Sequence, residues 1–250
     1  MAIIERPATV PAFVGDASAS PPALVTPTAA LGAFKRPVST TGWKSWVFTV
    51  DHKKLGLMYG AVSLFFFLVG GLEALLIRLQ LAAPDNTVLS ADLYNQMFTM
   101  HATTMVFLFV MPMAAAFANY FLPLQVGARD VAFPRINALG FWLFLFGGIF
   151  LNTSWVLGGA ADGGWFMYSP NSSPLFSPSH GIDFWVLGLQ ITGIASLVGA
   201  INLIVTIINM RAPGMSLMRM PVFAWLQLVT QSLLLFAMPA SPLAQPWSLV

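Results

Sequence analysis

The chain has 250 residues, of which 8% are charged and 57% hydrophobic, with a formal net charge of +2 and a mean hydropathy of +0.77. A soluble domain carries about 25% charged residues, so this composition excludes a soluble enzyme or a disordered chain and favours an integral membrane protein. The chain has no cysteine, which excludes thiolate metal sites, and no basic cluster dense enough for nucleic-acid binding.

Residues 1–42 contain many Pro, Ala, Ser and Thr and no apolar core of a secretory signal, so we expect a disordered arm. Five apolar runs follow that are long enough to cross a bilayer, at about 55–79, 97–121, 138–159, 184–208 and 222–238. We predict an all-α, polytopic transmembrane helix bundle over residues 43–238. Pro239, Pro242 and Pro246 are expected to end the last helix before a divergent tail, 239–250.

The basic residues predict the orientation of the bundle. Ten of the eleven fall before the first run or in the second-to-third and fourth-to-fifth connections, while the other two connections carry aspartates. Lys and Arg are retained on the cytoplasmic side, so the N-terminus is predicted to be cytoplasmic, in a bacterial inner membrane. Arg78 is the exception, because it lies near the outer end of the first run.

His101 lies about one helical turn inside the outer end of the second run, at a depth similar to that of Arg78. An arginine inside the membrane costs roughly 2.5–3.5 kcal/mol on insertion scales and needs a carboxylate, propionate or carbonyl partner. A neutral imidazole without an acidic neighbour suits an axial ligand of haem iron. A histidine bonded to a neighbouring helix explains the position as well, and the spacing leaves both open.

Two acidic residues have more than one interpretation. Glu73 precedes Arg78 by five residues, which is a poor spacing for a helical ion pair, yet we favour a structural role over a proton-handling one. Asp130 is either a salt-bridged surface residue or the mouth of a hydrated proton path. Polar residues that could line such a path are Asn119, Asn137, Tyr59, Ser196 and Asn202.

Three further residues have simple structural explanations. His52 follows a predicted helix cap, Asp51, and is expected to anchor the helix at the headgroup level with the adjacent lysines. His180 is expected to serve a cap or loop outside the membrane. Trp165 suits the aromatic belt at the membrane interface.

The sequence resembles the N-terminal part of subunit I of the haem-copper oxidases from about Trp43 to about Met238. The matching segments are residues 49–59, residues 74–81, the His101 segment and the loop 122–137, whose run Gly-Ala-Arg-Asp-Val-Ala-Phe-Pro-Arg-Ile-Asn is highly specific. Arg135 is similar to the residue found in the cytochrome c oxidases, whereas quinol oxidases tend to have an apolar residue there.

The resemblance implies a function and a set of site residues. His101 matches one of the two axial ligands of the low-spin haem, of type A, Arg78 matches an arginine at the haem formyl group, and Trp165 matches a tryptophan near the propionates. Asp130 matches the entrance of a proton channel lined by Asn119, Asn137, Tyr59, Ser196 and Asn202. The family passes electrons from cytochrome c to dioxygen and pumps protons, together with other oxidase subunits in the bilayer.

The sequence also departs from the family. Gly140 and Ala195 stand where many relatives have channel hydroxyls, which implies a drier or rerouted water path. The copper ligands, the high-spin haem ligand and the second low-spin ligand belong to helices beyond residue 250, so we expect a truncated or partial product without catalytic residues of its own. We expect the 250-residue chain alone not to reduce oxygen. The alternative is an inert fragment or a proton-conducting bundle, which a haem spectrum distinguishes.

Overall fold

The computed structural model describes residues 42–244, with side chains through residue 239. The secondary structure of this part of the chain is entirely helical. Its elements are α1 (Lys44–Val47), α2 (His52–Gln80), α3 (Ala91–Thr103), the π-helix η1 (Thr104–Val110), α4 (Met111–Val126), α5 (Pro134–Thr153), α6 (Gly181–Asn209), the 3-10 helix η2 (Leu217–Arg219) and α7 (Val222–Ala244). Because α3, η1 and α4 are continuous, the described residues contain five helices long and apolar enough to cross a membrane, which confirms the predicted fold class. The predicted arm, 1–42, lies almost wholly outside the described residues.

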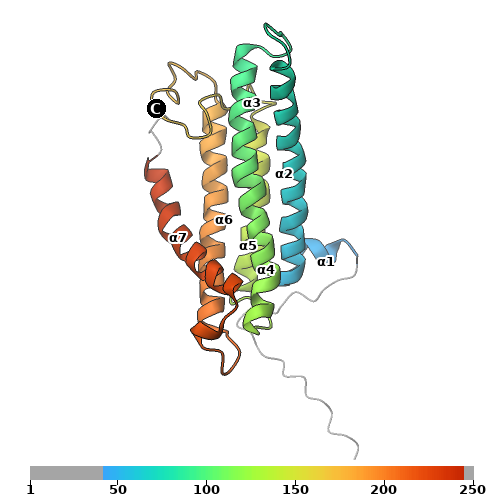
Figure 1. The fold of residues 1–250 in the computed structure, drawn as a ribbon, viewed down its shortest axis with the longest axis vertical. Helices are drawn as coiled ribbons and strands as arrows, with labels where there is room; N and C mark the ends of the chain where they lie inside the picture. Colours follow the sequence, from blue (N-terminus) through green and yellow to red (C-terminus); the bar gives the residue numbers. More distant parts are fainter. Residues whose placement is uncertain (1–41, 245–250) are drawn as a thin grey trace, which may run out of the picture. The chain divides into compact units, whose positions relative to one another are not determined.

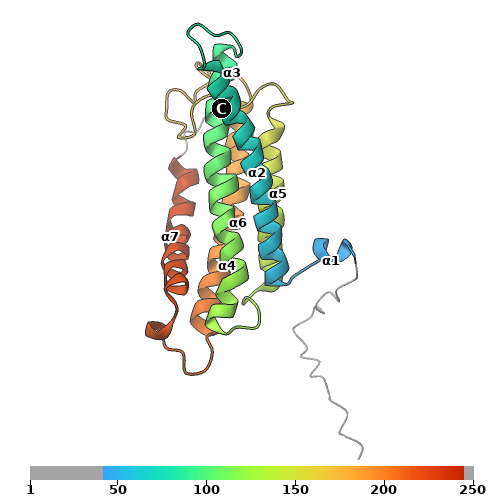
Figure 2. The ribbon, with the colours of Figure 1, turned by 45° about the vertical axis from the view of Figure 1, so that its right-hand side comes forward.

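The long helices lie side by side and alternate in direction (Figures 1 and 2). The α2–α3 and α5–α6 connections share one end of the bundle, and the start of α2 shares the other end with the α4–α5 and α6–α7 connections. This second end, called here the basic end, carries Lys53, Lys54, Arg129, Arg135, Arg211 and Arg219. Arg78, in the last turn of α2, lies towards the opposite end.

Local sequence signals explain where the helices begin. The backbone N–H groups of Lys53 and Lys54 donate to Asp51 Oδ1 at 2.8 and 3.1 Å, which confirms the predicted cap of α2. Pro134 occupies the first turn of α5, where its missing N–H costs nothing. Gly127 ends α4 in the left-handed conformation, with φ 75°, which a residue with a Cβ adopts at a cost.

Two helix ends differ from the predictions. Helix α5 ends at Thr153, short of the predicted residue 159, because the chain turns at Ser154 and reaches Gly158 and Gly159, each with φ 112°. The prediction that Pro239 ends the last helix is wrong, since α7 continues to Ala244. A proline removes one backbone hydrogen bond, and membrane helices tolerate this loss where neighbouring groups compensate.

Helices α5 and α6 cross at two glycines. A Cβ added at Gly188 would lie 2.7 Å from Leu151 Cβ and 3.2 Å from the Gly147 carbonyl oxygen. A Cβ added at Gly147 would in turn lie 2.8 Å from Thr192 Cγ2. Small residues at such a crossing let two backbones approach closely, which is how helices gain packing energy inside a membrane.

Replacing Gly188 with alanine is therefore expected to destabilise the bundle by about 1–3 kcal/mol through overpacking. The matched control is Gly199→Ala on the same helix, where nothing lies within 4 Å of the added Cβ. Thermal unfolding of the detergent-solubilised protein, followed by circular dichroism, measures both. Equal melting temperatures for the two variants would contradict the proposed role of the crossing.

The connection between α5 and α6 packs onto the end of the bundle opposite the basic end. It forms one buried apolar cluster with α3, α5 and α6, made of Met100, Leu151, Ala160, Ala161, Met167, Ile182 and Trp185. This packing fixes the backbone that carries Trp165 against the helix that carries His101.

Candidate functional site

The His101 side chain is held by one of its two ring nitrogens. Its Nδ1 lies 2.8 Å from the carbonyl oxygen of Gly70 on α2. A carbonyl oxygen only accepts hydrogen bonds, so Nδ1 carries the proton and the lone pair lies on Nε2. The ring is half-buried. The neighbouring helix takes one ring nitrogen, as one of the two sequence interpretations expected, and this bond leaves Nε2 unused for the other interpretation.

The close approach of α2 to His101 depends on Gly70 and on the π-helix. A Cβ at Gly70 would lie 3.3 Å from Thr104 Cγ2 and 3.4 Å from Met105 Cγ, which is tighter than most Cβ contacts. These two residues begin the π-helix η1, three positions after His101. π-Helical turns within α-helices occur frequently at functional sites, and this one starts three residues after the candidate ligand, His101.

The two other candidate charges on α2 are not paired with each other. Glu73 is 5% exposed and neither of its carboxylate oxygens has a hydrogen bond of normal geometry, although the Trp155 side chain lies close enough to interact. Arg78 is exposed, about 12 Å farther along α2 than Gly70. No ion pair joins Glu73 to Arg78, as the five-residue spacing suggested. The structure places Arg78 on the same helix as the partner of His101, but not against the imidazole.

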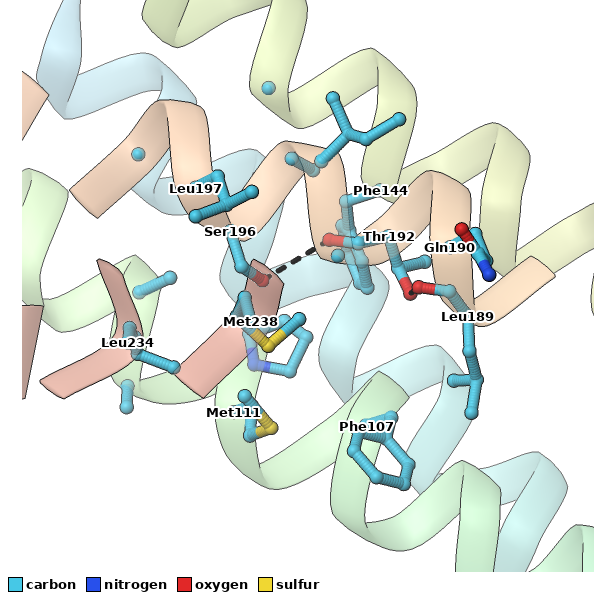
Figure 3. Close-up of a pocket in the computed structure, with 18 of the residues that line it drawn as sticks. Phe107, Met111, Phe144, Leu189, Gln190, Thr192, Ser196, Leu197, Leu234 and Met238 are labelled. Atoms are coloured by element: carbon cyan, nitrogen blue, oxygen red, sulfur yellow. Dashed lines mark hydrogen bonds between the residues drawn. The ribbon is translucent and has the colours of Figure 1, made fainter. Parts of the chain in front are cut away.

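A cavity of about 720 Å³ lies among the long helices. Its lining includes Tyr59, Asn119, Asn137 and Ser196, four of the residues expected to line a proton path. Trp165, 41% exposed, contributes to the same lining. Figure 3 shows the region around Ser196 of α6, whose hydroxyl donates to the Thr192 carbonyl oxygen at 3.1 Å, with Met111 and Met238 nearby.

Asp130 and Asn202 lie at the basic end, and neither is among the residues that line the cavity. Asp130 is buried in the α4–α5 connection, where Val131 N donates to its Oδ1 at 2.8 Å. Asn202 Oδ1 accepts from Phe133 N at 2.7 Å, so this residue fastens the connection to α6. Asn202 thus holds the backbone of the α4–α5 connection three residues after Asp130.

Three buried amide groups near this region have polar atoms without a protein partner. They are Asn119 Oδ1, Asn137 Nδ2 and Asn202 Nδ2. Buried polar atoms in proteins are nearly always satisfied, by protein or by ordered water. These atoms are therefore expected to bind water between the Asp130 connection and the cavity.

The histidines outside the second span have structural roles. His52 is 2% exposed and its Nδ1 lies 2.8 Å from the Asn119 carbonyl oxygen. The residue expected to be an anchor at the headgroups is therefore buried, and it hydrogen-bonds α2 to α4. His180 precedes α6 as predicted, and its Nδ1 lies 3.0 Å from Asp183 Oδ2. Among the described residues, no group of three or more His, Asp or Glu side chains could hold a metal ion.

Sequence reasoning missed two polar residues of α7. Gln227 and Gln231 are buried, both line the cavity, and Gln231 Nε2 donates to Gln227 Oε1 at 3.0 Å. The sequence signal for these two residues was their spacing of four within an apolar span, because this spacing places both side chains on one helix face.

Gly140 and Ala195, which stand where many relatives have channel hydroxyls, line the same cavity.

Comparison with known proteins identifies the family. The family described as "Cytochrome C and Quinol oxidase polypeptide I" matches residues 54–250. The chain belongs to this family. Family members similar to it include cytochrome c oxidase subunit 1 of Bacillus subtilis (strain 168), which is 58% identical over 202 residues, covering 80% of this chain and 32% of the relative. Cytochrome c oxidase subunit 1 of Bacillus sp. (strain PS3) is also 58% identical, over 83% of this chain and 33% of its own length.

Members named as quinol oxidases match less closely. Quinol oxidase subunit 1 of Bacillus subtilis (strain 168) is 46% identical over 202 residues, covering 81% of this chain and 31% of the relative. The chain thus spans about a third of the length of the curated family members that it matches.

Proposed function

We propose that this chain forms part of the catalytic subunit of a respiratory cytochrome c oxidase and holds its low-spin haem through His101 Nε2. The observation that carries the proposal is the hydrogen bond between His101 Nδ1 and the Gly70 carbonyl. Ligating histidines commonly donate their second N–H to a carbonyl, which fixes the tautomer and the ring orientation. His101 Nε2 would supply one ligand to the haem iron, and we assign no second ligand to the described residues of this chain.

A haem bound at this position supplies reversible one-electron chemistry, as it does elsewhere in proteins. The residues of this chain hold and orient it: His101 supplies the ligand nitrogen, and Trp165 and Arg78 are the candidates for contacts at the haem periphery. Family membership, together with the haem and copper that haem-copper oxidases use, supports these assignments. We assign neither copper nor the high-spin haem to the described residues of this chain.

The proton path forms the second half of the proposal. Asp130 collects protons at the basic end, and water held by Asn119, Asn137 and Asn202 passes them towards the cavity. The unpartnered amide atoms of these three residues support this path. Tyr59, Ser196, Gln227 and Gln231 continue the polar lining where Gly140 and Ala195 contribute none.

The proposed electron donor is cytochrome c, delivered through another oxidase subunit. Arg135 and the higher identity to relatives named cytochrome c oxidase than to the relative named quinol oxidase support this donor. The enzyme is proposed to lie in a bacterial inner membrane with its basic end in the cytoplasm, because the lysines in the first turn of α2 share that end with the arginines in or beside the α4–α5 and α6–α7 connections.

The complete purified oxidase that contains this chain is expected to show a reduced low-spin haem band and to oxidise reduced cytochrome c faster than a quinol. Reduced-minus-oxidised spectra and oxygen consumption with each donor measure this. A haem-free complex would favour the alternative function, a proton-conducting helical bundle, which the polar cavity also supports. Faster turnover with the quinol would contradict the assigned donor.

A further inference from the structure

Two threonines flank His101 on the opposite face of its helix. Thr99 and Thr103 precede and follow His101 by two residues, and both are fully buried. At 100° per residue, two positions correspond to 200°, so both hydroxyls lie on the side of α3 turned away from the imidazole. A threonine hydroxyl within a helix can bond a carbonyl oxygen of the preceding turn of the same helix. Each of these two makes a second bond to another part of the fold.

Thr103 joins α3 to α6. Its Oγ1 donates to the Thr99 carbonyl oxygen at 2.8 Å and accepts from Trp185 Nε1 at 2.9 Å. Trp185 is buried, and its indole N–H is a donor that needs a partner inside the membrane. Removing the Thr103 oxygen would leave this donor unsatisfied, so the bond fixes the rotation of α3 relative to α6.

Thr99 joins α3 to the connection that carries Trp165. Its Oγ1 donates to the Asn95 carbonyl oxygen at 2.9 Å and accepts from Gly164 N at 2.9 Å. Gly164 has φ 81°, a conformation that suits glycine, and it directly precedes Trp165. The backbone position of Trp165 is therefore tied to the same helix face as Thr103.

Helix α3 is thus hydrogen-bonded on both faces at the level of His101. On one face His101 Nδ1 donates to the Gly70 carbonyl of α2, and on the other the two threonines accept from Trp185 and Gly164. Rotating a helix by 10° moves a ring atom about 6 Å from its axis by roughly 1 Å. A metal ligand must be held within about 0.5 Å and 10–20° of its productive geometry.

We propose that Thr99, Thr103 and Trp185 are positioning residues. They set the rotation of α3 so that His101 Nε2 faces the haem iron, and Thr99 also holds the backbone next to Trp165 at a fixed position relative to α3. The inference rests on the proposed function, in which His101 is an axial ligand. The threonines touch neither the metal nor the reacting atoms. They act through the orientation of His101 and the placement of Trp165.

The test uses Thr103→Val in the complete oxidase, because valine keeps the shape of threonine and removes its oxygen. We expect a shifted or broadened electron paramagnetic resonance signal of the low-spin haem and about tenfold weaker haem retention. Thr103→Ser restores the oxygen and is expected to restore the signal. The matched control is Thr153→Val on α5, because the Thr153 hydroxyl donates to the Ile149 carbonyl oxygen of its own helix at 2.9 Å and does not line the cavity.

A milder variant guards against misfolding of Thr103→Val. Trp185→Phe removes the same inter-helix bond and leaves the Thr103 hydroxyl bonded to the Thr99 carbonyl. It is expected to shift the haem signal in the same direction, and the double variant is expected to add little to either change. An unchanged signal in Trp185→Phe and Thr103→Val, with melting as in Thr153→Val, would overturn the inference. A low-spin haem that survives His101→Ala would instead overturn the proposed function.

Discussion

Replacing His101 with alanine in the complete oxidase is expected to abolish the low-spin haem signal and electron transfer to oxygen. Alanine removes the only histidine of the described second span, and with it the nitrogen that would hold the low-spin haem from this chain. Optical and electron paramagnetic resonance spectra of the purified complex, with its haem content, measure the loss. The matched control is His180→Ala, whose imidazole is 86% exposed and bonds Asp183.

Added imidazole separates a ligand role from a structural one. Because His101→Ala leaves a space of imidazole size beside the Gly70 carbonyl, free imidazole is expected to enter it and restore part of the low-spin signal. A histidine that merely joined α3 to α2 would give no spectral recovery with imidazole. Normal haem spectra in His101→Ala without imidazole would contradict the assignment of His101 as a haem ligand.

Replacing Asp130 with asparagine is expected to slow oxygen reduction at least about tenfold, which corresponds to about 1.4 kcal/mol in the activation free energy. Asparagine keeps an Oδ1 that can accept from Val131 N, so the α4–α5 connection retains its shape. It cannot take up and release a proton, however. The expected loss therefore reports proton transfer and not folding.

Two further variants sharpen this experiment. Asp130→Glu keeps a carboxylate and is expected to retain most of the turnover. Asp183→Asn, at the opposite end of the bundle, is expected to leave it unchanged. Oxygen consumption and proton release from vesicles that contain the enzyme measure all three. Wild-type turnover in Asp130→Asn would contradict the assignment of Asp130 as the proton entrance.

Much of the fold was predictable because the signals are local. A span of about 20 apolar residues is visible in any window of the sequence, and the cap at Asp51 and the glycine at the end of α4 need only their neighbours. The distribution of Lys and Arg grouped the connections correctly at one end of the bundle. His101 and Asp130 stood out because charged and titratable residues are rare in these spans and their connections.

The tertiary structure decided which contacts each of these residues makes, since these contacts join residues far apart in the chain. The Gly70 carbonyl that leaves His101 Nε2 available lies 31 positions away, and the Asn119 carbonyl that turns His52 from a surface anchor into a buried tie lies 67 positions away. Asn202 holds the Asp130 connection across 69 positions. Hydropathy and spacing determine which segments enter the membrane, but apolar helices can pack at many rotations. Only packing chooses the rotation that gives each buried polar atom its partner.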